Sequence, residues 1–317
     1  MSTTVDLAKR LGTTVLRRGP ARQAALRLAR ASHRSLVLVY HRVAPDGPAA
    51  HEVVPSLPTA LFAAQLDMLQ QIGQVVALER LLESHATNQG PRFAITFDDD
   101  HVSHRLHALP VLKARGLHAT FFLSGRSLHG LGPYWWNILE HSIHVRGLES
   151  TRRVLALDGN GPPELAAALE DSPLTERLSR LLPCPEDSPM PAGDIDALAR
   201  AGMTIGFHTL RHPIMTDVPC AALDAALAEG RSALAAAAGT SVDLFAYPHG
   251  RADATAAIAA ERAGFRAAFA SGGRPISPRS DPFLLGRWDP GFLVQDEFAA
   301  AVTLRLLRPP TPPCSRR

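Results

Sequence analysis

Short apolar runs alternate with amphipathic stretches along most of the chain. Runs rich in β-branched and aromatic residues predict seven strands, over residues 36–40, 75–78, 93–97, 119–123, 203–207, 244–247 and 267–270. Helical spacing of apolar residues predicts helices between most of them, over residues 59–72, 106–115, 195–201, 221–238 and 253–263, the last with Asp253 as its N-cap. Alternation with right-handed crossovers predicts a parallel sheet, which either closes into a barrel or stays open and doubly wound.

Two of these strands end in side chains that can bind a metal ion. One apolar run delivers Asp98 and Asp99 at its carboxyl end, and another is followed by His208 and His212. Adjacent carboxylates raise each other's pKa unless a cation is near. Histidines four residues apart lie on one face if the chain turns helical after the strand, with a hydrogen-bonded structural pair as the alternative. Together the four side chains indicate a centre with three protein ligands and one carboxylate for proton transfer, suited to zinc or its neighbours.

Three motifs of the sequence resemble those of a known family. Thr96–Asp99, His208–His212 and Phe245–Gly250 are similar, in order and spacing, to the first three motifs of the polysaccharide deacetylases, the NodB-homology or carbohydrate esterase 4 group. The resemblance extends from about Leu36 to Arg287. It implies an α/β fold, a distorted (β/α)7 barrel with an insertion between its fourth and fifth strands. It also implies a divalent metal ion, most often Zn²⁺, and removal of the acetyl group from an N-acetylated sugar.

The resemblance assigns roles to residues of the first two motifs. It implies that Asp98 is the general base and that Asp99, His208 and His212 hold the metal. The physical chemistry agrees, because a metal lowers the pKa of bound water towards about 7. Asp98 can then take the proton as that water attacks the acetyl carbonyl.

The third motif is expected to stabilise the developing oxyanion. By the same resemblance, the donor is the backbone N–H of His249, which follows the rigid Pro248. Tyr247 is a candidate for lining the cleft, and packing in the core is its alternative.

The sequence also departs from the family pattern. Asp100 stands where the family has glycine, so either the site is more acidic than usual or this carboxylate faces solvent. Ala246 stands where many relatives have an arginine that orients the base, and Arg287 from a later strand is the candidate replacement. No Leu-x-His motif for the catalytic acid is found near the C-terminus. His41 follows the apolar strand ending at Tyr40, as in the branch acting on poly-N-acetylglucosamine-type polymers, and is the candidate acid; a structural hydrogen bond is its alternative.

A long segment over about residues 125–194 interrupts the alternation of strands and helices. Its aromatic start includes Trp135 and Trp136, candidates for stacking on sugar rings in a lid over the cleft. Anchoring of the insertion on the barrel wall is the alternative for one of the two. Trp288 is a further candidate for the cleft, with packing as its alternative.

Three more histidines follow the first motif. His101, His104 and His107 have near-helical spacing, which is typical of a solvated helix face. We therefore expect no second metal site there.

Composition suits one enzyme-sized domain, with 46% hydrophobic and 20% charged residues among 317. We place a basic extension at residues 1–34, the barrel at residues 35–303 and a Pro/Arg-rich tail at residues 304–317. Residues 1–35 hold eight Lys/Arg and one acid, and the tail holds four Arg and no acid, which leaves 21 basic against 29 acidic residues between them. The acidic body argues against nucleic acid as a partner.

The termini carry no clear targeting signal. The basic extension lacks the uninterrupted apolar core of a secretory signal, and no later run has the roughly 18 apolar residues of a membrane span. Cys184, Cys220 and Cys314 offer no disulfide framework. We expect a cytoplasmic protein, with peripheral membrane contact through the basic N-terminus as the alternative.

Three functions from different classes follow. The leading hypothesis is a metal-dependent hydrolase that removes acetyl groups from N-acetylated sugars of a polysaccharide or glycan intermediate. Asp100, Ala246 and the missing C-terminal histidine make a non-catalytic glycan-binding barrel the second. The third is a metal-dependent hydrolase of small non-sugar amides, which a narrow closed pocket would favour.

Overall fold

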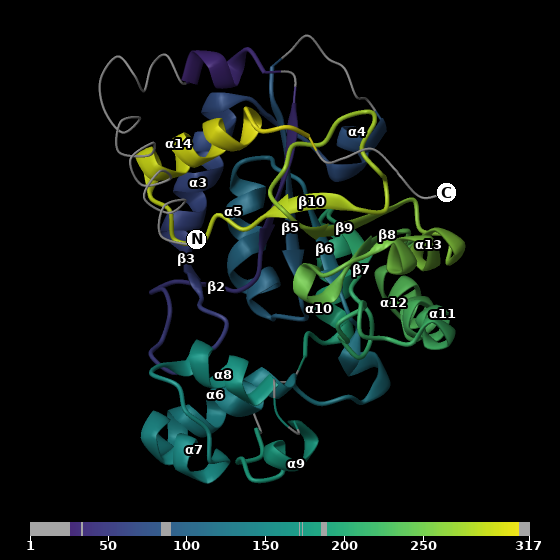
Figure 1. Cartoon of the computed structure of the whole chain (residues 1–317). Coiled ribbons are helices and arrows are strands. Elements are labelled where there is room, and N and C mark those ends of the chain that lie inside the picture. Colours follow the sequence, from purple (N-terminus) through teal and green to yellow (C-terminus); the bar gives the residue numbers. More distant parts are fainter. Residues whose placement is uncertain are drawn as a thin grey trace.

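Seven parallel strands close into a barrel (Figure 1). The computed structural model describes residues 26–32, 34–83, 90–170, 172, 174–184 and 189–310. The barrel strands are β1 (Ser35–Tyr40), β5 (Arg92–Asp98), β6 (Ala119–Leu123), β7 (Thr204–Phe207), β8 (Leu244–Ala246), β9 (Ala267–Ser271) and β10 (Leu285–Trp288). Their order is β1-β10-β9-β8-β7-β6-β5, and pairing of β5 with β1 completes the ring. The (β/α)7 barrel is confirmed, and the open doubly wound sheet is excluded.

One predicted strand lies outside the ring. The run over residues 75–78 forms only the two-residue β4 (Gln74–Val75), after which α4 (Leu78–Glu83) begins. β1 occupies one edge of β5 from its first residue, Arg92, so β4 pairs with the other edge at Arg92 and Phe93, before β6 begins to pair at Ile95. The seventh place in the ring therefore goes to β10, the strand that carries Arg287.

Helices cover the outside of the barrel between the strands. They are α3 (Thr59–Ile72), α5 (Leu109–Ala114), α10 (Ala192–Arg200), α11 (Cys220–Ala228), α12 (Arg231–Ala238), α13 (Ala254–Arg262) and α14 (Gln295–Leu306). The helix predicted over residues 221–238 is two helices, because Gly230 adopts a left-handed φ of +85° between them. Asp253 caps α13 as predicted, its side chain accepting a hydrogen bond from the Ala256 N–H at 2.8 Å.

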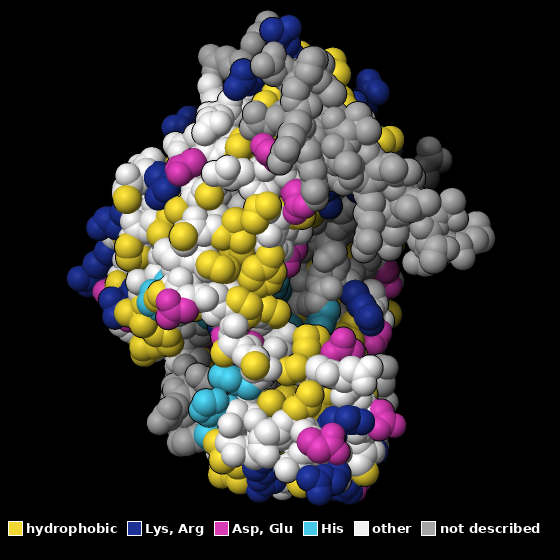
Figure 2. Space-filling view, turned by 90° about the vertical axis from the view of Figure 1, so that its left-hand side faces the viewer, with side chains coloured by type: hydrophobic (Ala, Val, Ile, Leu, Met, Phe, Trp, Pro, Cys, Tyr) yellow, Lys and Arg dark blue, Asp and Glu magenta, His cyan; other side chains and the backbone are white. Residues whose placement is uncertain are grey.

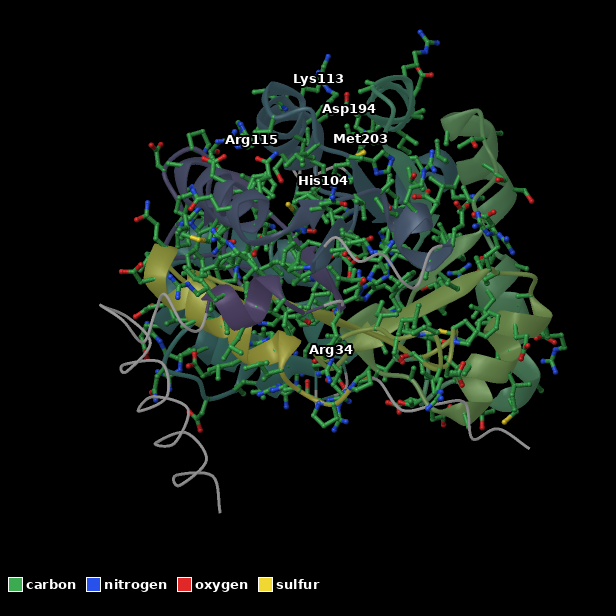
Figure 3. All side chains as sticks on the ribbon, turned by 90° about the horizontal axis from the view of Figure 1, so that it is seen from above. Arg34, His104, Lys113, Arg115, Asp194 and Met203 are labelled. Atoms are coloured by element: carbon green, nitrogen blue, oxygen red, sulfur yellow. The ribbon has the colours of Figure 1, made fainter. Side chains whose placement is uncertain are left out.

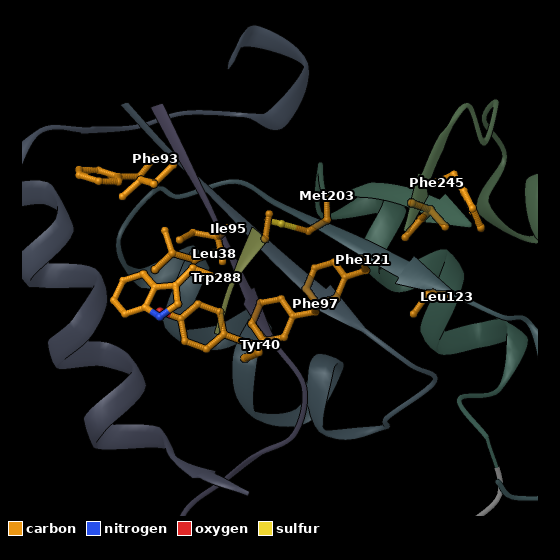
Figure 4. Close-up of a cluster of buried hydrophobic side chains, with 14 of the residues drawn as sticks. Leu38, Tyr40, Phe93, Ile95, Phe97, Phe121, Leu123, Met203, Phe245 and Trp288 are labelled. Atoms are coloured by element: carbon orange, nitrogen blue, oxygen red, sulfur yellow. The ribbon is translucent and has the colours of Figure 1, made fainter. Parts of the chain in front are cut away.

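The core lies inside the barrel and between the barrel and its helices (Figure 4). Every residue of β1 and β5 is buried, as expected for strands of a parallel sheet that is covered on both faces. Phe97 and Phe121 stack with ring centroids 4.8 Å apart, and Tyr40 packs edge-on against Phe62. This packing fixes the strand ends that carry the polar motifs.

The insertion forms a helical lobe below the barrel in Figure 1. It contains η2 (Arg126–His129), α6 (Trp135–Arg146), α7 (Leu148–Leu155), α8 (Pro162–Glu170) and α9 (Leu174–Leu178). Helices α6 to α9 share an apolar cluster built around Leu139, Leu155, Leu165 and Leu169.

A buried carboxylate joins this lobe to the barrel. The carboxylate of Glu140, in α6, accepts hydrogen bonds from two guanidinium nitrogens of Arg42, at 3.2 and 2.9 Å. It also accepts hydrogen bonds from the backbone N–H groups of Val53 and Val54, at 2.7 and 3.1 Å. Val53 and Val54 lie in the loop between the short strands β2 (Val43–Ala44) and β3 (Leu57–Pro58). One side chain thus fixes both the lobe and this loop to the barrel.

The first and last described segments of the chain both contact the barrel or its helices. In the predicted extension, Ala29 is fully buried and Arg30 donates to the Gln71 carbonyl of α3 at 3.0 Å, whereas residues 1–25 lie outside the described part. At the other end, α14 continues to Leu306, and residues 311–317 of the predicted tail lie outside it. Among the described residues, no helix combines the length and apolarity that crossing a bilayer requires.

Candidate metal centre and cleft

The residues of the first two motifs meet at the carboxyl end of the barrel. Asp98 is the last residue of β5, and His208 directly follows β7. The backbone is strained here, because Asp99, Thr209, His212 and His249 have φ values of 71°, 56°, 54° and 56°. Such left-handed conformations cost about 1 kcal/mol or more each for residues other than glycine and concentrate at functional sites.

Asp99, His208 and His212 form a possible metal-binding triad, because their ligand atoms all lie within 4.8 Å of one another. Asp99 Oδ1 is 3.3 Å from His212 Nε2 and 3.7 Å from His208 Nε2. His208 Nδ1 lies 2.8 Å from the Ala246 carbonyl oxygen, to which it donates, so Nε2 carries the lone pair that faces Asp99.

The donor set fits a divalent ion. Asp99 Oδ1 is buried and has no hydrogen-bond partner among the described residues. A buried carboxylate oxygen left in this way is costly unless a cation completes its surroundings. One carboxylate and two imidazoles leave a fourth position for water or substrate, as in catalytic zinc sites.

The electrostatics of the triad also suit metal binding. Burial raises the pKa of Asp99, but the close contacts with His101 and His212, and the positive charges of His212 and His208, hold this pKa well below its ordinary value. Burial lowers the pKa of His208 to about 4. At neutral pH the carboxylate is therefore ionised and His208 is neutral, which are the forms that bind a metal.

Asp98 is held by Arg287. Its two oxygens each accept a hydrogen bond from a different guanidinium nitrogen, both at 2.6 Å, and Arg287 also donates to the Thr96 hydroxyl at 3.2 Å. Burial raises the pKa of Asp98, but the charges of Arg287 and His208 and the hydrogen bonds from Arg287 lower it to a net value below the ordinary one. The arginine that the third motif lacks at Ala246 thus has a counterpart from β10, in contact with Asp98.

Asp100 neither faces solvent nor joins the triad. It is 4% exposed and accepts hydrogen bonds from the backbone N–H groups of Ser124, Gly125 and Arg126, at 2.8, 3.3 and 2.9 Å. Burial raises its pKa, and these three donors offset only part of the effect. The third carboxylate therefore binds the chain where the insertion begins.

The prediction that His101, His104 and His107 form a solvated helix face is wrong for the first two. His104 is fully buried, against Phe97 and Phe121, and donates from Nε2 to the His41 carbonyl at 3.0 Å. Figure 3 shows it well inside the molecule, whereas Lys113 lies at the edge. His101 is also buried, with Nε2 3.7 Å from Asp99 Oδ2. His101 precedes the helix, and His104 begins a π-helical turn, η1 (His104–Ala108), so the three histidines do not share one regular helix face.

A cleft of about 670 Å³ opens over these residues. Its barrel side includes His41, Asp98, Asp99, His208, His212, His249, Arg287 and Trp288. Its other side is mainly apolar and comes from the insertion and the β2–β3 loop: Val53, Val54, Pro55, Trp135, Trp136, Pro163, Ala166, Ala167 and Glu170. In Figure 2, histidine side chains also gather where the lower lobe joins the barrel.

The aromatic candidates divide between cleft and core. Trp135 and Trp136 both line the cleft, and Trp136 stacks on Tyr134 with ring centroids 4.3 Å apart. Tyr247 is fully buried and donates its hydroxyl to the Phe283 carbonyl at 2.8 Å. It therefore packs in the core beneath the site, and its neighbour Pro248 is buried as well.

Sequence reasoning missed three charged residues of the cleft. Glu170 ends α8, with Oε1 3.5 Å from His249 Nδ1, and Asp289 and Arg305 lie after β10 and in α14. Single charged residues on helices or in loops are normally solvated, so no local pattern distinguishes these three.

Comparisons with known proteins agree with this architecture. The polysaccharide deacetylase family model matches residues 85–268. Among solved structures, the deacetylase PplD of Streptococcus pyogenes in complex with acetate is 15% identical and covers 87% of this chain and 99% of its own, with a TM-score of 0.59. IcaB of Ammonifex degensii is 22% identical, with 85% and 97% covered and a TM-score of 0.56. At these identities the two structures support the fold. No curated protein matches the sequence.

Proposed function

The chain belongs to the polysaccharide deacetylase family, whose members are hydrolases of carbon–nitrogen bonds other than peptide bonds, and from this premise we propose that it removes acetyl groups from N-acetylated sugars with the help of a divalent metal ion. The observation that carries the proposal is the buried, unpartnered Oδ1 of Asp99 beside two imidazole nitrogens, with the carboxylate of Asp98 next to it in the chain.

The proposed metal ligands are Asp99, His208 and His212, and Zn²⁺ is the proposed ion because imidazole and carboxylate donors suit it. A divalent ion bound there would supply positive charge that polarises the acetyl carbonyl and lowers the pKa of water. The tautomer of His208 supports this assignment, since its Nδ1–H is committed to the Ala246 carbonyl.

Asp98 is the proposed general base. Its lowered pKa keeps it ionised at neutral pH, and each carboxylate oxygen retains a second lone pair after accepting from Arg287. Arg287 would act by positioning, because two hydrogen bonds at 2.6 Å define the plane of the carboxylate. Asp98 would take the proton of the attacking water as the carbon–oxygen bond forms.

His249 and His41 complete the proposed machinery. The backbone N–H of His249 is the proposed donor to the oxyanion, and the side chain of the same residue lines the cleft. His41 lines the same cleft, and its positive charge contributes to lowering the pKa of Asp98, which supports its place near the base. In its protonated form His41 would give a proton to the departing sugar nitrogen, and the carbon–nitrogen bond would then break to release acetate and the free amine.

The test is acetate release from chitooligosaccharides by the zinc-loaded protein. Asp98→Asn should abolish turnover while zinc stays bound, and a chelator should abolish it in the wild type. Asp224→Asn, on the exposed surface, is the matched control. Turnover that persists in Asp98→Asn and in chelator would refute the mechanism.

A cytoplasmic location and peripheral contact of the basic N-terminus with a membrane stay proposals from the sequence. The excess of Lys/Arg in residues 1–35 supports the membrane contact. The support for the location is the interrupted apolar pattern of that segment, which does not resemble a secretory signal. Fractionation of cells that express the full chain would test both.

A further inference from the structure

Two arginines line the cleft, and in the described part of the chain only one of them has a carboxylate partner. Arg287 is held by Asp98. Arg305 of α14 lines the same cleft, but among the described residues no carboxylate lies within ion-pair distance of it, and its one side-chain hydrogen bond runs to the Ala301 carbonyl, at 3.3 Å. The cleft therefore contains a positive charge that the proposed deacetylation does not use.

The surroundings hold this guanidinium in place. Its Cζ lies 3.9 Å from the centroid of the Trp288 ring, a cation–π contact. Its Nε is buried and has no hydrogen-bond partner among the residues that the structure describes, and a Cβ added to Gly273 would lie 3.4 Å from that atom. The indole and the glycine backbone thus fix one side of the group, and Nη2 has no protein partner within the described chain.

The charge is retained at neutral pH. Burial lowers the pKa of Arg305 to about 10, with a smaller contribution from the charge of Arg308. A partly desolvated cation without a counter-charge is unfavourable, so a function is needed to explain it. Within the described part of the chain, neither of the other carboxylates that line this end of the cleft forms an ion pair with Arg305: Asp289 accepts from the Gly291 N–H at 2.7 Å, and Glu170 lies beside His249.

We propose that Arg305 determines substrate specificity by binding an anionic substituent, a phosphate ester or a carboxylate, on or next to the N-acetylated sugar. A guanidinium offers a planar pair of donors that matches these groups in a bidentate way, whereas a neutral sugar needs no positive charge. The proposal rests on the proposed deacetylase function, because it names the class of sugar that the same site accepts.

The experiment compares three probes on the zinc-loaded full chain: N-acetylglucosamine 1-phosphate, a glucuronosyl-N-acetylglucosamine disaccharide, and neutral diacetylchitobiose. Arg305→Gln should raise KM for an acidic probe about 10- to 100-fold, the range for a lost hydrogen bond to a charged group. It should leave kcat for all probes, and KM for the neutral probe, unchanged. Arg305→Lys should restore part of the loss. Arg308→Gln, which removes an exposed charge near the same helix end, is the matched control.

Calorimetric binding of the same probes to the metal-free protein separates this proposal from the deacetylase function. If no probe is hydrolysed but an acidic probe binds more tightly than the neutral one and loses this advantage in Arg305→Gln, the deacetylase proposal fails and this one stands. A response to the phosphate probe alone, or to the carboxylate probe alone, identifies the anion. The specificity proposal would be overturned if the wild type bound acidic and neutral probes with equal affinity. It would also be overturned if Arg305→Gln, with the melting temperature of the wild type, lost the same affinity for both kinds of probe.

Discussion

The two walls of the cleft are built in different ways. The barrel wall concentrates buried titratable groups at strand ends, including Asp98, Asp99 and His208. Asp98 is paired with Arg287, and the other two belong to the candidate metal-binding triad. The insertion wall is mainly apolar and consists of helix faces and one loop, with Trp135 and Trp136 as its largest side chains. Glu140 links the two walls through Arg42.

The contrast separates chemistry from binding. Charges that act on a bond must be held rigidly and desolvated, and strand ends inside a packed ring provide this. Contact with the face of a sugar needs apolar area, which helices of a peripheral lobe can present and vary without disturbing the ring. Substitutions on the barrel wall should therefore change kcat, and those on the insertion wall should change KM.

The largest effect is expected from removing a proposed metal ligand. Asp99→Ala should lower kcat/KM at least about a thousandfold, because several kcal/mol of transition-state stabilisation are lost with the ion. Zinc content by elemental analysis, measured beside acetate release, checks the cause. A variant that keeps full activity without zinc would contradict the metal assignment.

Loss of Arg287, the partner of Asp98, is expected to lower the stability of the fold. Arg287→Met leaves a buried carboxylate without its partner and should cost about 3 kcal/mol of unfolding free energy. The pKa of Asp98 lies below its ordinary value of 3.8, so the pair stabilises the fold above that value and loses this contribution as pH falls through the folded pKa.

Denaturant titrations between pH 7 and pH 3 measure this difference. The wild type should lose stability towards acid more steeply than Arg287→Met. Parallel curves for the two proteins would show that the pair does not couple to Asp98 ionisation.

The candidate acid should have an intermediate effect. His41→Gln is expected to lower kcat about a hundredfold, within the range for general acids, and to remove the alkaline limb of the pH–rate profile. His144→Gln, an exposed histidine outside this cleft, is the control. An unchanged profile for His41→Gln would leave His41 with only a structural role.

The smallest effect is expected on the insertion wall. Trp135→Ala should raise KM about tenfold and leave kcat nearly unchanged, because it removes apolar contact with the sugar rather than charge at the reacting bond. Trp135→Phe should recover most of the affinity. A loss confined to kcat would show that the two walls do not divide the work in this way.

The local pattern of the sequence was sufficient for most strands and for the triad. Apolar runs that end in Asp98 and Asp99, or before His208, are strands that begin and end within a few residues of their predicted bounds. The carboxyl ends of parallel strands meet at one mouth, so the sequence could indicate which side chains converge there.

Other features had no local signal. A run over residues 75–78 looks like a barrel strand, but β10 takes that place in the ring. The spacing of His101 and His104 predicts a solvated face, but both are buried, His101 before the helix and His104 at the start of a π-helical turn. Asp100 could only be interpreted once its three backbone donors from the start of the insertion were in view.

The sequence by itself determined the alternation of strands and helices, the polar residues at the strand ends, and through them the family and the candidate ligand set. The sequence offered Arg287 as a candidate partner of Asp98, and the structure shows the two paired across 189 positions of chain. Only the tertiary structure decided that Asp100 accepts from three N–H groups and that Arg305 has no carboxylate partner within the described residues. The physical reason is the difference in distance along the chain over which the two kinds of information act. Periodicity and polarity act over a few residues, whereas the compensation of a buried charge depends on which distant segments the closing of the ring brings together.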